Sequence, residues 1–414
     1  MSTASKNNLS FPGISQIRIY GSYLEINRTP FRFRFAILLV TLLCYFSCTV
    51  NTSNNNADMP DSGGEGIYHA GGFAIEESGD FTILSVINPW QGASDLVFRY
   101  VLASRDSDTG DELFLDGNKV PVIRTPVSSV ICLSTTHIAL LDFIDETASI
   151  VAVSGGDFIY NSGIRERREQ GDLPGIGYDL NLNYERILDL NPEVIFAYGV
   201  DAEAAAWLDR LRDLGMNVIL IGEYLENSPL AQAEWVKFVA RLFEKQDMAA
   251  EKFSSMEKEY MQLAGLAAAS GQKPVVMSGL PWRNSWFVPG GNSHFARLIN
   301  DAGGRYLWDN NRGRENFPVD LEKVIEQSAT ADYWINTGTA LSMSDIGGID
   351  KRLTSLRPYR LNNIYNNNAR LNQSGGNDYW ESGIVNPHLI LKDLIHILHP
   401  GILPGHEPFY YRQL

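Results

Sequence analysis

The spacing of hydrophobic residues divides the chain into regions of different secondary structure. Within the first quarter of the chain, short apolar runs at Phe73 to Ile75 and Phe81 to Val86 flank a Ser-Gly-Asp turn, which predicts an antiparallel β-hairpin. From Pro121 onward, short apolar runs alternate with segments of helical period, beginning with a strand at 127–133 and a helix at 135–143. This alternation is typical of a parallel sheet covered by helices.

A long helical stretch interrupts this alternation. Residues 230 to 269 have heptad-like apolar spacing and are rich in Ala, Glu and Lys, with a break expected near 245–247, and strands and helices resume at Pro274. The predicted fold class is therefore α/β, with two Rossmann-like lobes containing parallel sheets, joined by a long interlobe α-helix, plus an N-terminal β-hairpin unit. The predicted parts are a signal sequence (1–48), a flexible tether (49–66), the N-terminal β-unit (67–120), the N-lobe (121–243), the interlobe helix (244–270) and the C-lobe (271–414).

The pattern of the N-terminal residues predicts an export signal. Three arginines at 28, 32 and 34 precede a mostly apolar run at 35–46, which is too short to remain as a membrane-spanning helix. Tyr45-Phe46-Ser47-Cys48 is a loose lipobox with bulky aromatics where small aliphatic residues are usual. Cleavage before Cys48 would allow lipidation of that cysteine, and the Asn- and Ser-rich segment after it suits a tether. We expect a periplasmic protein that is lipid-anchored to a bacterial membrane.

Composition restricts the function classes further. The formal net charge is −15, which disfavours nucleic acid and anionic lipid surfaces as partners. The three cysteines are too few for a disulfide framework, and Cys132 lies in an apolar strand as a small core residue. The chain has no nucleophile elbow, no Walker loop and no His-Glu-x-x-His helix. We therefore expect no enzyme activity and no cofactor of its own.

One short pattern occurs twice, once in each predicted lobe. Residues 183–190 and 320–327 both contain an N-cap residue, a variable residue, Glu, a base, two aliphatic residues and an acid. Glu185 and Glu322 fall in the first turn of their helices and point outward. Simple complementarity to the helix dipole explains either glutamate alone. A matched pair, one per lobe, also suggests a docking surface.

Several stretches in this order resemble the metal-chelate solute-binding proteins of ABC importers, which take up ferric siderophores, haem and cobalamin. They are residues 127–136, 182–195, 211–218, 292–304 and 379–381. The segment before Pro121 resembles an extra β-unit of Bacteroidetes-type lipoproteins in this family. The resemblance implies two lobes with the ligand in the cleft between them, a monomer, and an ABC permease dimer in the inner membrane as partner. It also implies that Glu185 and Glu322 pair with arginines of the two permease subunits.

The cleft of such a fold is formed by loops at the carboxyl ends of parallel strands. In these loops Tyr and Trp outnumber charged residues, which suits a bulky, partly apolar metal chelate as cargo. His137 opens a helix beside the cleft and is a candidate axial ligand to a bound metal centre. The predicted ligand-binding residues are Thr135, Thr136, Tyr178, Tyr198, Tyr224, Trp282, Trp286, Tyr379 and Trp380.

The identity of the cargo stays open at this point, and so do three alternatives to an iron-chelate binding protein. An iron chelate, either a siderophore or haem, is the first expectation, and a corrinoid is the second. A bare Zn or Mn ion would need about four converging His, Asp or Glu ligands; His396 and His399 share a helix face but give only a weak signal. A chelatase-like enzyme on the same two-lobe frame is the alternative from another class.

Overall fold

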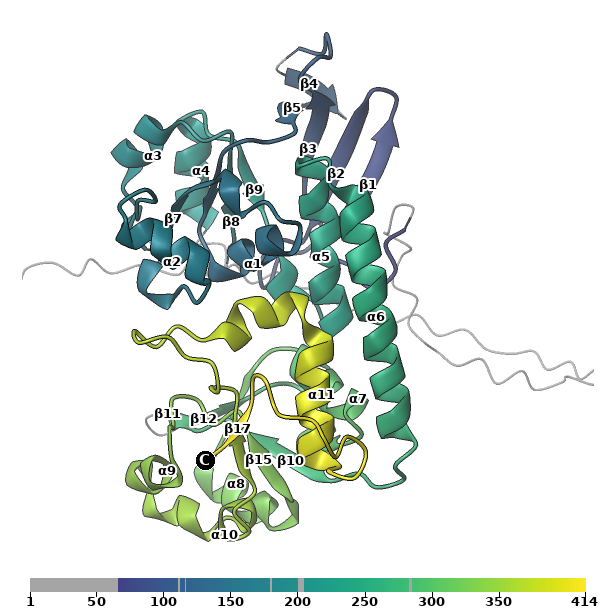
Figure 1. Cartoon of the computed structure of the whole chain (residues 1–414), viewed down its shortest axis with the longest axis vertical. Coiled ribbons are helices and arrows are strands. Elements are labelled where there is room, and N and C mark those ends of the chain that lie inside the picture. Colours follow the sequence, from purple (N-terminus) through teal and green to yellow (C-terminus); the bar gives the residue numbers. More distant parts are fainter. Residues whose placement is uncertain (1–65, 111, 116, 179–180, 200–204, 283–284) are drawn as a thin grey trace, which may run out of the picture. The chain divides into compact units, whose positions relative to one another are not determined.

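A computed structural model describes residues 66–414 except 111, 116, 179–180, 200–204 and 283–284, all within one compact unit (Figure 1). The predicted signal sequence, its lipobox cysteine Cys48 and the tether as far as residue 65 lie outside the described residues. The fold is mixed α/β with parallel sheets in two lobes, so the predicted fold class is confirmed.

The N-terminal β-unit is a full sheet rather than a single hairpin. Its first two strands pair around Gly79, whose φ of +62° suits the tight turn, with Ser78 opposite Phe81. The unit extends past the expected boundary at residue 120, because its last strand ends at Thr125. The strand order is β1-β2-β3-β5-β4, with β1 Phe73–Ser78, β2 Phe81–Ile87, β3 Val97–Ser104, β4 Glu112–Leu115 and β5 Asn118–Thr125.

The N-lobe is built on a four-stranded parallel sheet in the order β7-β6-β8-β9. Its strands are short and nearly completely buried, which explains their continuous apolar sequence. Side-chain caps from Ser134 and Asn183 begin helices α1 and α3 at the predicted positions. The elements are β6 Val130–Cys132, α1 Thr135–Phe143, β7 Ile150–Val153, α2 Ser162–Glu169, α3 Tyr184–Leu190, β8 Val194–Ala197, α4 Ala205–Asp213 and β9 Val218–Leu220.

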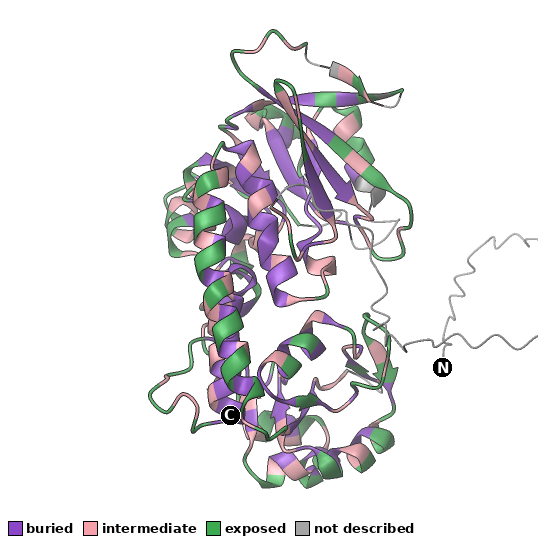
Figure 2. Cartoon of the chain, turned by 90° about the vertical axis from the view of Figure 1, so that its right-hand side faces the viewer, coloured by how far each residue is buried: buried purple, intermediate pink, exposed green. Residues whose placement is uncertain are grey.

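Two helices fill the stretch expected as one long helix with a break. Helix α5 spans Pro229–Leu242 and α6 spans Gln246–Ala268, and Glu244 in the turn between them has a φ of +56°. Helix α5 is buried over most of its surface, whereas α6 has an exposed outer face (Figure 2). Helix α6 runs alongside both lobes and packs against α11, a helix of the C-lobe (Figure 1).

The C-lobe contains a second sheet in the order β13-β10-β15-β16-β17, parallel except for its last strand, and a small antiparallel sheet, β11-β12-β14. One continuous hydrophobic core connects both lobes and the β-unit. The strands are β10 Val275–Ser278, β11 Pro281–Trp282, β12 Ser285–Val288, β13 Arg305–Tyr306, β14 Phe317–Val319, β15 Tyr333–Ile335, β16 Ile364–Asn366 and β17 Arg412–Gln413. The helices are α7 His294–Asp301, α8 Leu321–Gln327, α9 Met343–Ile349, α10 Arg357–Arg360 and α11 Pro387–Leu398.

Candidate ligand-binding site

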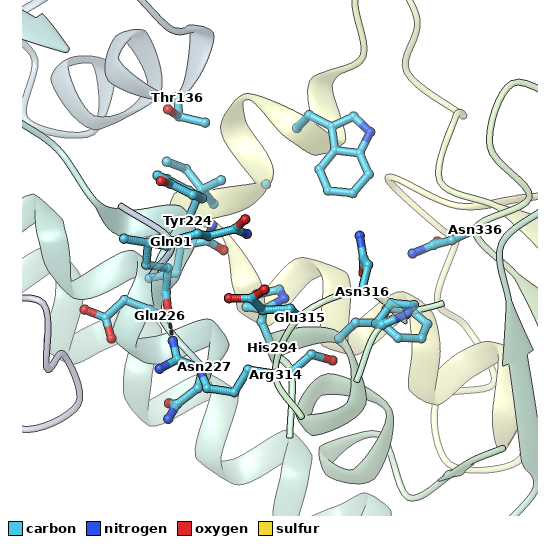
Figure 3. Close-up of a pocket in the computed structure, with 18 of the residues that line it drawn as sticks. Gln91, Thr136, Tyr224, Glu226, Asn227, His294, Arg314, Glu315, Asn316 and Asn336 are labelled. Atoms are coloured by element: carbon cyan, nitrogen blue, oxygen red, sulfur yellow. Dashed lines mark hydrogen bonds between the residues drawn. The ribbon is translucent and has the colours of Figure 1, made fainter. Parts of the chain in front are cut away.

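A cavity of about 720 Å³ lies where the two lobes and the β-unit meet (Figure 3). A cavity of this size accommodates an organic ligand rather than a single ion. Aromatic rings and carboxamides dominate its lining, with few charged groups. The side chains that line it include Asn88, Trp90, Gln91, Thr136, Tyr224, Glu226, Asn227, Gln232, Phe287, His294, Phe295, Arg314, Glu315, Asn316, Asn336, Tyr379 and Trp380.

Four of the predicted ligand residues line this cavity: Thr136, Tyr224, Tyr379 and Trp380. Tyr224 lies in a short 3-10 helix, and its hydroxyl donates to the Gly199 carbonyl. Trp380 is 59% exposed and meets the ring of Tyr379 edge-on, with 4.7 Å between centroids. The buried Tyr379 thus holds in place an indole that remains available to a ligand.

The other predicted residues lie elsewhere. Thr135, Tyr178 and Tyr198 are not among the residues that line the cavity, and the side chain of Trp282 lies outside the described residues. The prediction for Trp286 is wrong because its indole is completely buried, donates to the Ser278 carbonyl at 3.0 Å and packs on Trp334. Strand alternation places its neighbour Phe287 outward, and Phe287 lines the cavity instead.

His137 is also a core residue rather than a cavity residue. Its imidazole is fully buried against Phe196 and Tyr198, and burial lowers its pKa to about 3. The histidine that does line the cavity is His294, at the start of α7 after the N-cap Ser293. Burial lowers the pKa of His294 to about 4, so this imidazole is neutral at neutral pH. The Gly-Gly-Asn-Ser sequence before it was the available signal for a loop followed by a helix start.

The charged groups of the lining connect the three parts of the fold. Glu226 accepts backbone N–H bonds from Gly71 and Gly72 of the β-unit, at 3.2 and 2.9 Å, and a bond from the Trp235 indole at 3.0 Å. Arg314 of the C-lobe donates to the Leu225 carbonyl of the N-lobe. The cavity is therefore closed on this side by a charge-assisted bond between the lobes.

A second cavity, of about 620 Å³, adjoins the first and shares Asn227, Ser293 and Arg314 with it. Its charged lining is strongly positive, with one acid, Asp309, against five bases. This is unusual for a chain with a net charge of −15. The five bases are Lys273, Arg297, Arg305, Arg312 and Arg314.

The lobes also meet through a buried carboxylate. Glu381, which follows the loop that carries Trp380, accepts the backbone N–H groups of Tyr160 and Asn161 in the N-lobe, both at 2.7 Å. Burial raises the pKa of Glu381 to about 7. The carboxamide of Asn372 adds a bond to the Ile159 carbonyl at 2.8 Å.

The two predicted docking glutamates are exposed in the first turns of α3 and α8. Glu322 accepts a bond from Arg352 at 3.0 Å, with 77% of its side chain exposed. Among the residues that the structure describes, no three His, Cys, Asp or Glu side chains gather as a metal-ion site would require. Within that same part of the chain, none of the helices has the length and apolar character needed to cross a bilayer.

Comparison with known proteins agrees with this architecture. Residues 130–352 match the family model described as periplasmic binding protein. An uncharacterized lipoprotein of Methanocaldococcus jannaschii is 25% identical over 305 residues, which cover 71% of this chain and 70% of the relative.

Solved structures of similar fold include two whose names state a ligand. One is an ABC-type Fe3+-hydroxamate transport system protein of Saccharomonospora viridis, with 16% identity and a TM-score of 0.51, covering 70% of this chain and 98% of the other. The second is the periplasmic heme-binding protein RhuT of Roseiflexus sp. RS-1, with 20% identity and a TM-score of 0.51, covering 67% and 99%. At these identities the likeness shows the fold alone. The family match over more than half of its length shows that this chain belongs to the periplasmic binding protein family.

Proposed function

We propose that this protein is the lipid-anchored, periplasmic solute-binding component of an ABC importer, and that it captures an iron chelate, a siderophore or haem, and delivers it to the permease. The observation that carries the proposal is the cavity of about 720 Å³ between the two lobes of a periplasmic binding protein fold. In this role the protein acts as a monomer, catalyses no reaction and needs no cofactor of its own.

The volume and lining of the cavity favour a chelate over a bare Zn or Mn ion. A bare ion is held by about four oxygen, nitrogen or sulfur ligands within roughly 2.6 Å. This cavity has the volume of a drug-sized ligand and an aromatic and carboxamide lining. Trp380 and Phe287 offer flat apolar faces, and Asn316 and Asn336 offer hydrogen-bonding groups for the edge of a ligand.

The charge of the adjoining cavity favours an anionic chelate over a corrinoid, whereas the larger cavity itself is lined by two acids, Glu226 and Glu315, and one base, Arg314. The adjoining cavity places five bases beside the site, and an acidic protein surface elsewhere makes this local positive charge selective. Carboxylates or ionised catechols of a siderophore, or the propionates of haem, would extend from the larger cavity towards Arg312 and Arg314. The neutral imidazole of His294 is suited to an open coordination position of a haem iron.

A binding measurement tests the proposal. Purified protein is titrated with a ferric tricatecholate, which is anionic, with haemin and with cyanocobalamin, and tryptophan fluorescence and calorimetry are the readouts. We expect stoichiometric binding of one iron chelate, weaker or no binding of cyanocobalamin, and no release of free metal or altered ligand. Binding of none of the three would contradict the proposal, and preferred binding of cyanocobalamin would assign the protein to corrinoid uptake instead.

The substitution Trp380→Ala tests whether the cavity is the binding site. Removing the exposed indole should weaken binding of the preferred chelate about 10-fold or more, because a large aromatic contact face is lost. Phe114→Ala is the matched control, since Phe114 is an exposed aromatic residue of β4 that is not among the cavity residues. Equal affinities of the two variants would place the ligand elsewhere.

A further inference from the structure

The loop between β2 and β3, residues 88–96, reaches the cavity although the family match begins only at residue 130. We propose that the N-terminal β-unit is part of the ligand site, and that its loop selects among chelates by binding polar groups at the ligand's edge through Gln91. This inference rests on the proposed function and adds a specificity element that the two-lobe family fold does not itself supply.

The loop has a defined conformation of its own. The backbone N–H of Asn88 donates to the Leu96 carbonyl at 2.8 Å, and the side chain of Asn88 accepts from the Leu96 N–H at 3.2 Å. Asn88 has a φ of +49°, a conformation that asparagine tolerates better than most residues. A further turn bond joins the Ala93 N–H to the Trp90 carbonyl at 3.1 Å. The loop is therefore held at both ends and across its middle.

Trp90 packs the loop against the N-lobe. Its ring lies over Gly199, where an added Cβ would come within 3.3 Å of the indole. The indole also packs against Phe98, with 5.8 Å between ring centroids, and the Arg212 guanidinium lies 4.8 Å from the centroid of the Phe98 ring. Because the Gly199 carbonyl also accepts the Tyr224 hydroxyl, Trp90 and Tyr224 form one continuous wall of the cavity.

The β-unit is attached to the N-lobe by two carboxylates, one fully buried and one partly buried. Glu234 of α5 is fully buried and accepts the backbone N–H groups of His69 and Ala70 at 2.7 and 2.8 Å. Glu226 does the same for Gly71 and Gly72. Charge-assisted bonds of this kind are strong when desolvated, so the position of the loop relative to the cavity is set before a ligand arrives.

Gln91 is the side chain of the loop that is best placed to form hydrogen bonds with a ligand. It is exposed, and in Figure 3 it lies beside Tyr224 and Glu226 on the same side of the cavity. A carboxamide both donates and accepts hydrogen bonds, so it matches a hydroxamate, amide or carboxylate at the edge of a chelate. A site that hydrogen-bonds a ligand group discriminates strongly against analogues without that group.

Two substitutions test this inference from different sides. Gln91→Ala removes the polar contact, and Gly199→Ala displaces the ring of Trp90 from the N-lobe side without changing the sequence of the loop. Each substitution should lower the affinity for the probe chelate about 5-fold or more, where the probe is the chelate that the unaltered protein prefers. Gln91→Ala should also reduce the preference for that chelate over an analogue with its peripheral polar groups methylated. Gln170→Ala, at an exposed position after α2, is the matched control and should leave both quantities unchanged.

Hydrogen exchange provides a measurement that needs no variant. The probe chelate should slow exchange of backbone amides in residues 88–96 of the unaltered protein. A bound probe whose affinity is unchanged in both variants, with no protection of the loop, would overturn this inference and leave the proposed function standing. Binding of no probe by the unaltered protein would overturn the proposed function and this inference with it.

Discussion

At the scale of single residues, burial decides which ionisable side chains act as charges. His137 and His294 are both kept neutral by desolvation, but only His294 faces the cavity. The same effect raises the pKa of Glu381 to about 7. Burial therefore produces neutral imidazoles both in the core and at the candidate site, and position alone separates a structural histidine from a ligand.

His137 should make the stability of the protein depend on pH. Its folded pKa of about 3 lies below the 6.5 of an exposed histidine, so the unfolded chain binds an extra proton as pH falls below 6.5. This costs about 1.4 kcal/mol per pH unit, or roughly 2 kcal/mol at pH 5. His137→Leu should remove this term, so that its stability relative to the unaltered protein rises by about 2 kcal/mol between pH 7.5 and pH 5. Urea unfolding at both pH values measures the free energy of unfolding of the variant and of the unaltered protein. If the difference between the two proteins is the same at pH 7.5 and pH 5, the prediction is contradicted.

At the scale of elements, the attachment of the β-unit depends on two acids of the N-lobe, Glu226 and Glu234. Glu234 lies within α5 and caps backbone donors of the segment that enters β1, while Lys237 pairs with it at 2.7 Å. Tyr100 of β3 adds a contact to β9, since its hydroxyl accepts the Leu220 N–H at 3.0 Å. The unit is thus built into the N-lobe by polar bonds as well as by the shared core.

Glu234→Gln should loosen this attachment. The substitution keeps the shape but replaces one acceptor oxygen by a donor facing backbone N–H groups, and leaves Lys237 without its charge partner. We expect a loss of about 3 kcal/mol in the free energy of unfolding and faster hydrogen exchange in residues 68–78. Glu251→Gln, on the exposed face of α6, should change stability by less than about 0.5 kcal/mol. Equal effects of the two substitutions would show that the buried carboxylate does not anchor the unit.

At the scale of the whole molecule, the two lobes offer one exposed glutamate each, Glu185 on α3 and Glu322 on α8. We propose that these acids pair with arginines of the two permease subunits, as the resemblance to metal-chelate solute-binding proteins implies. Two charges on separate lobes specify the orientation of docking better than a single charge does. Ligand capture and docking then use different residues, which makes them separable by mutation.

Replacing both Glu185 and Glu322 with lysine should reduce uptake of the chelate in cells at least 10-fold and leave its affinity for the purified protein within 2-fold. Asp189→Lys with Glu326→Lys is the matched control, because it reverses the same number of exposed charges one turn further along the same two helices. The control should retain most of the uptake. Equal loss in both double variants would point to net charge, and no loss in either would remove the docking role.

Local signals in the sequence predicted most of the elements because they depend on neighbours a few residues apart. Ser134 and Asn183 cap α1 and α3 at the expected positions, and the buried parallel strands read as short apolar runs. The same signals could have separated Trp286 from Phe287. Alternation along β12 sends one side chain into the core and the next to the cavity.

The lining of the cavity depends on contacts between segments that are far apart in the sequence. Gln91, Thr136, His294 and Trp380 are separated by tens to hundreds of residues and come from the β-unit, the N-lobe and two segments of the C-lobe. Periodicity records which side of an element is buried, but it carries no information on which elements meet or where a buried face ends at a cavity. For this reason local patterns were enough to predict two α/β lobes and the caps of α1 and α3, whereas Asp320, in the matching position before α8, makes no side-chain cap bond. Long-range packing placed His294 rather than His137 at the site and brought the β-unit to its edge.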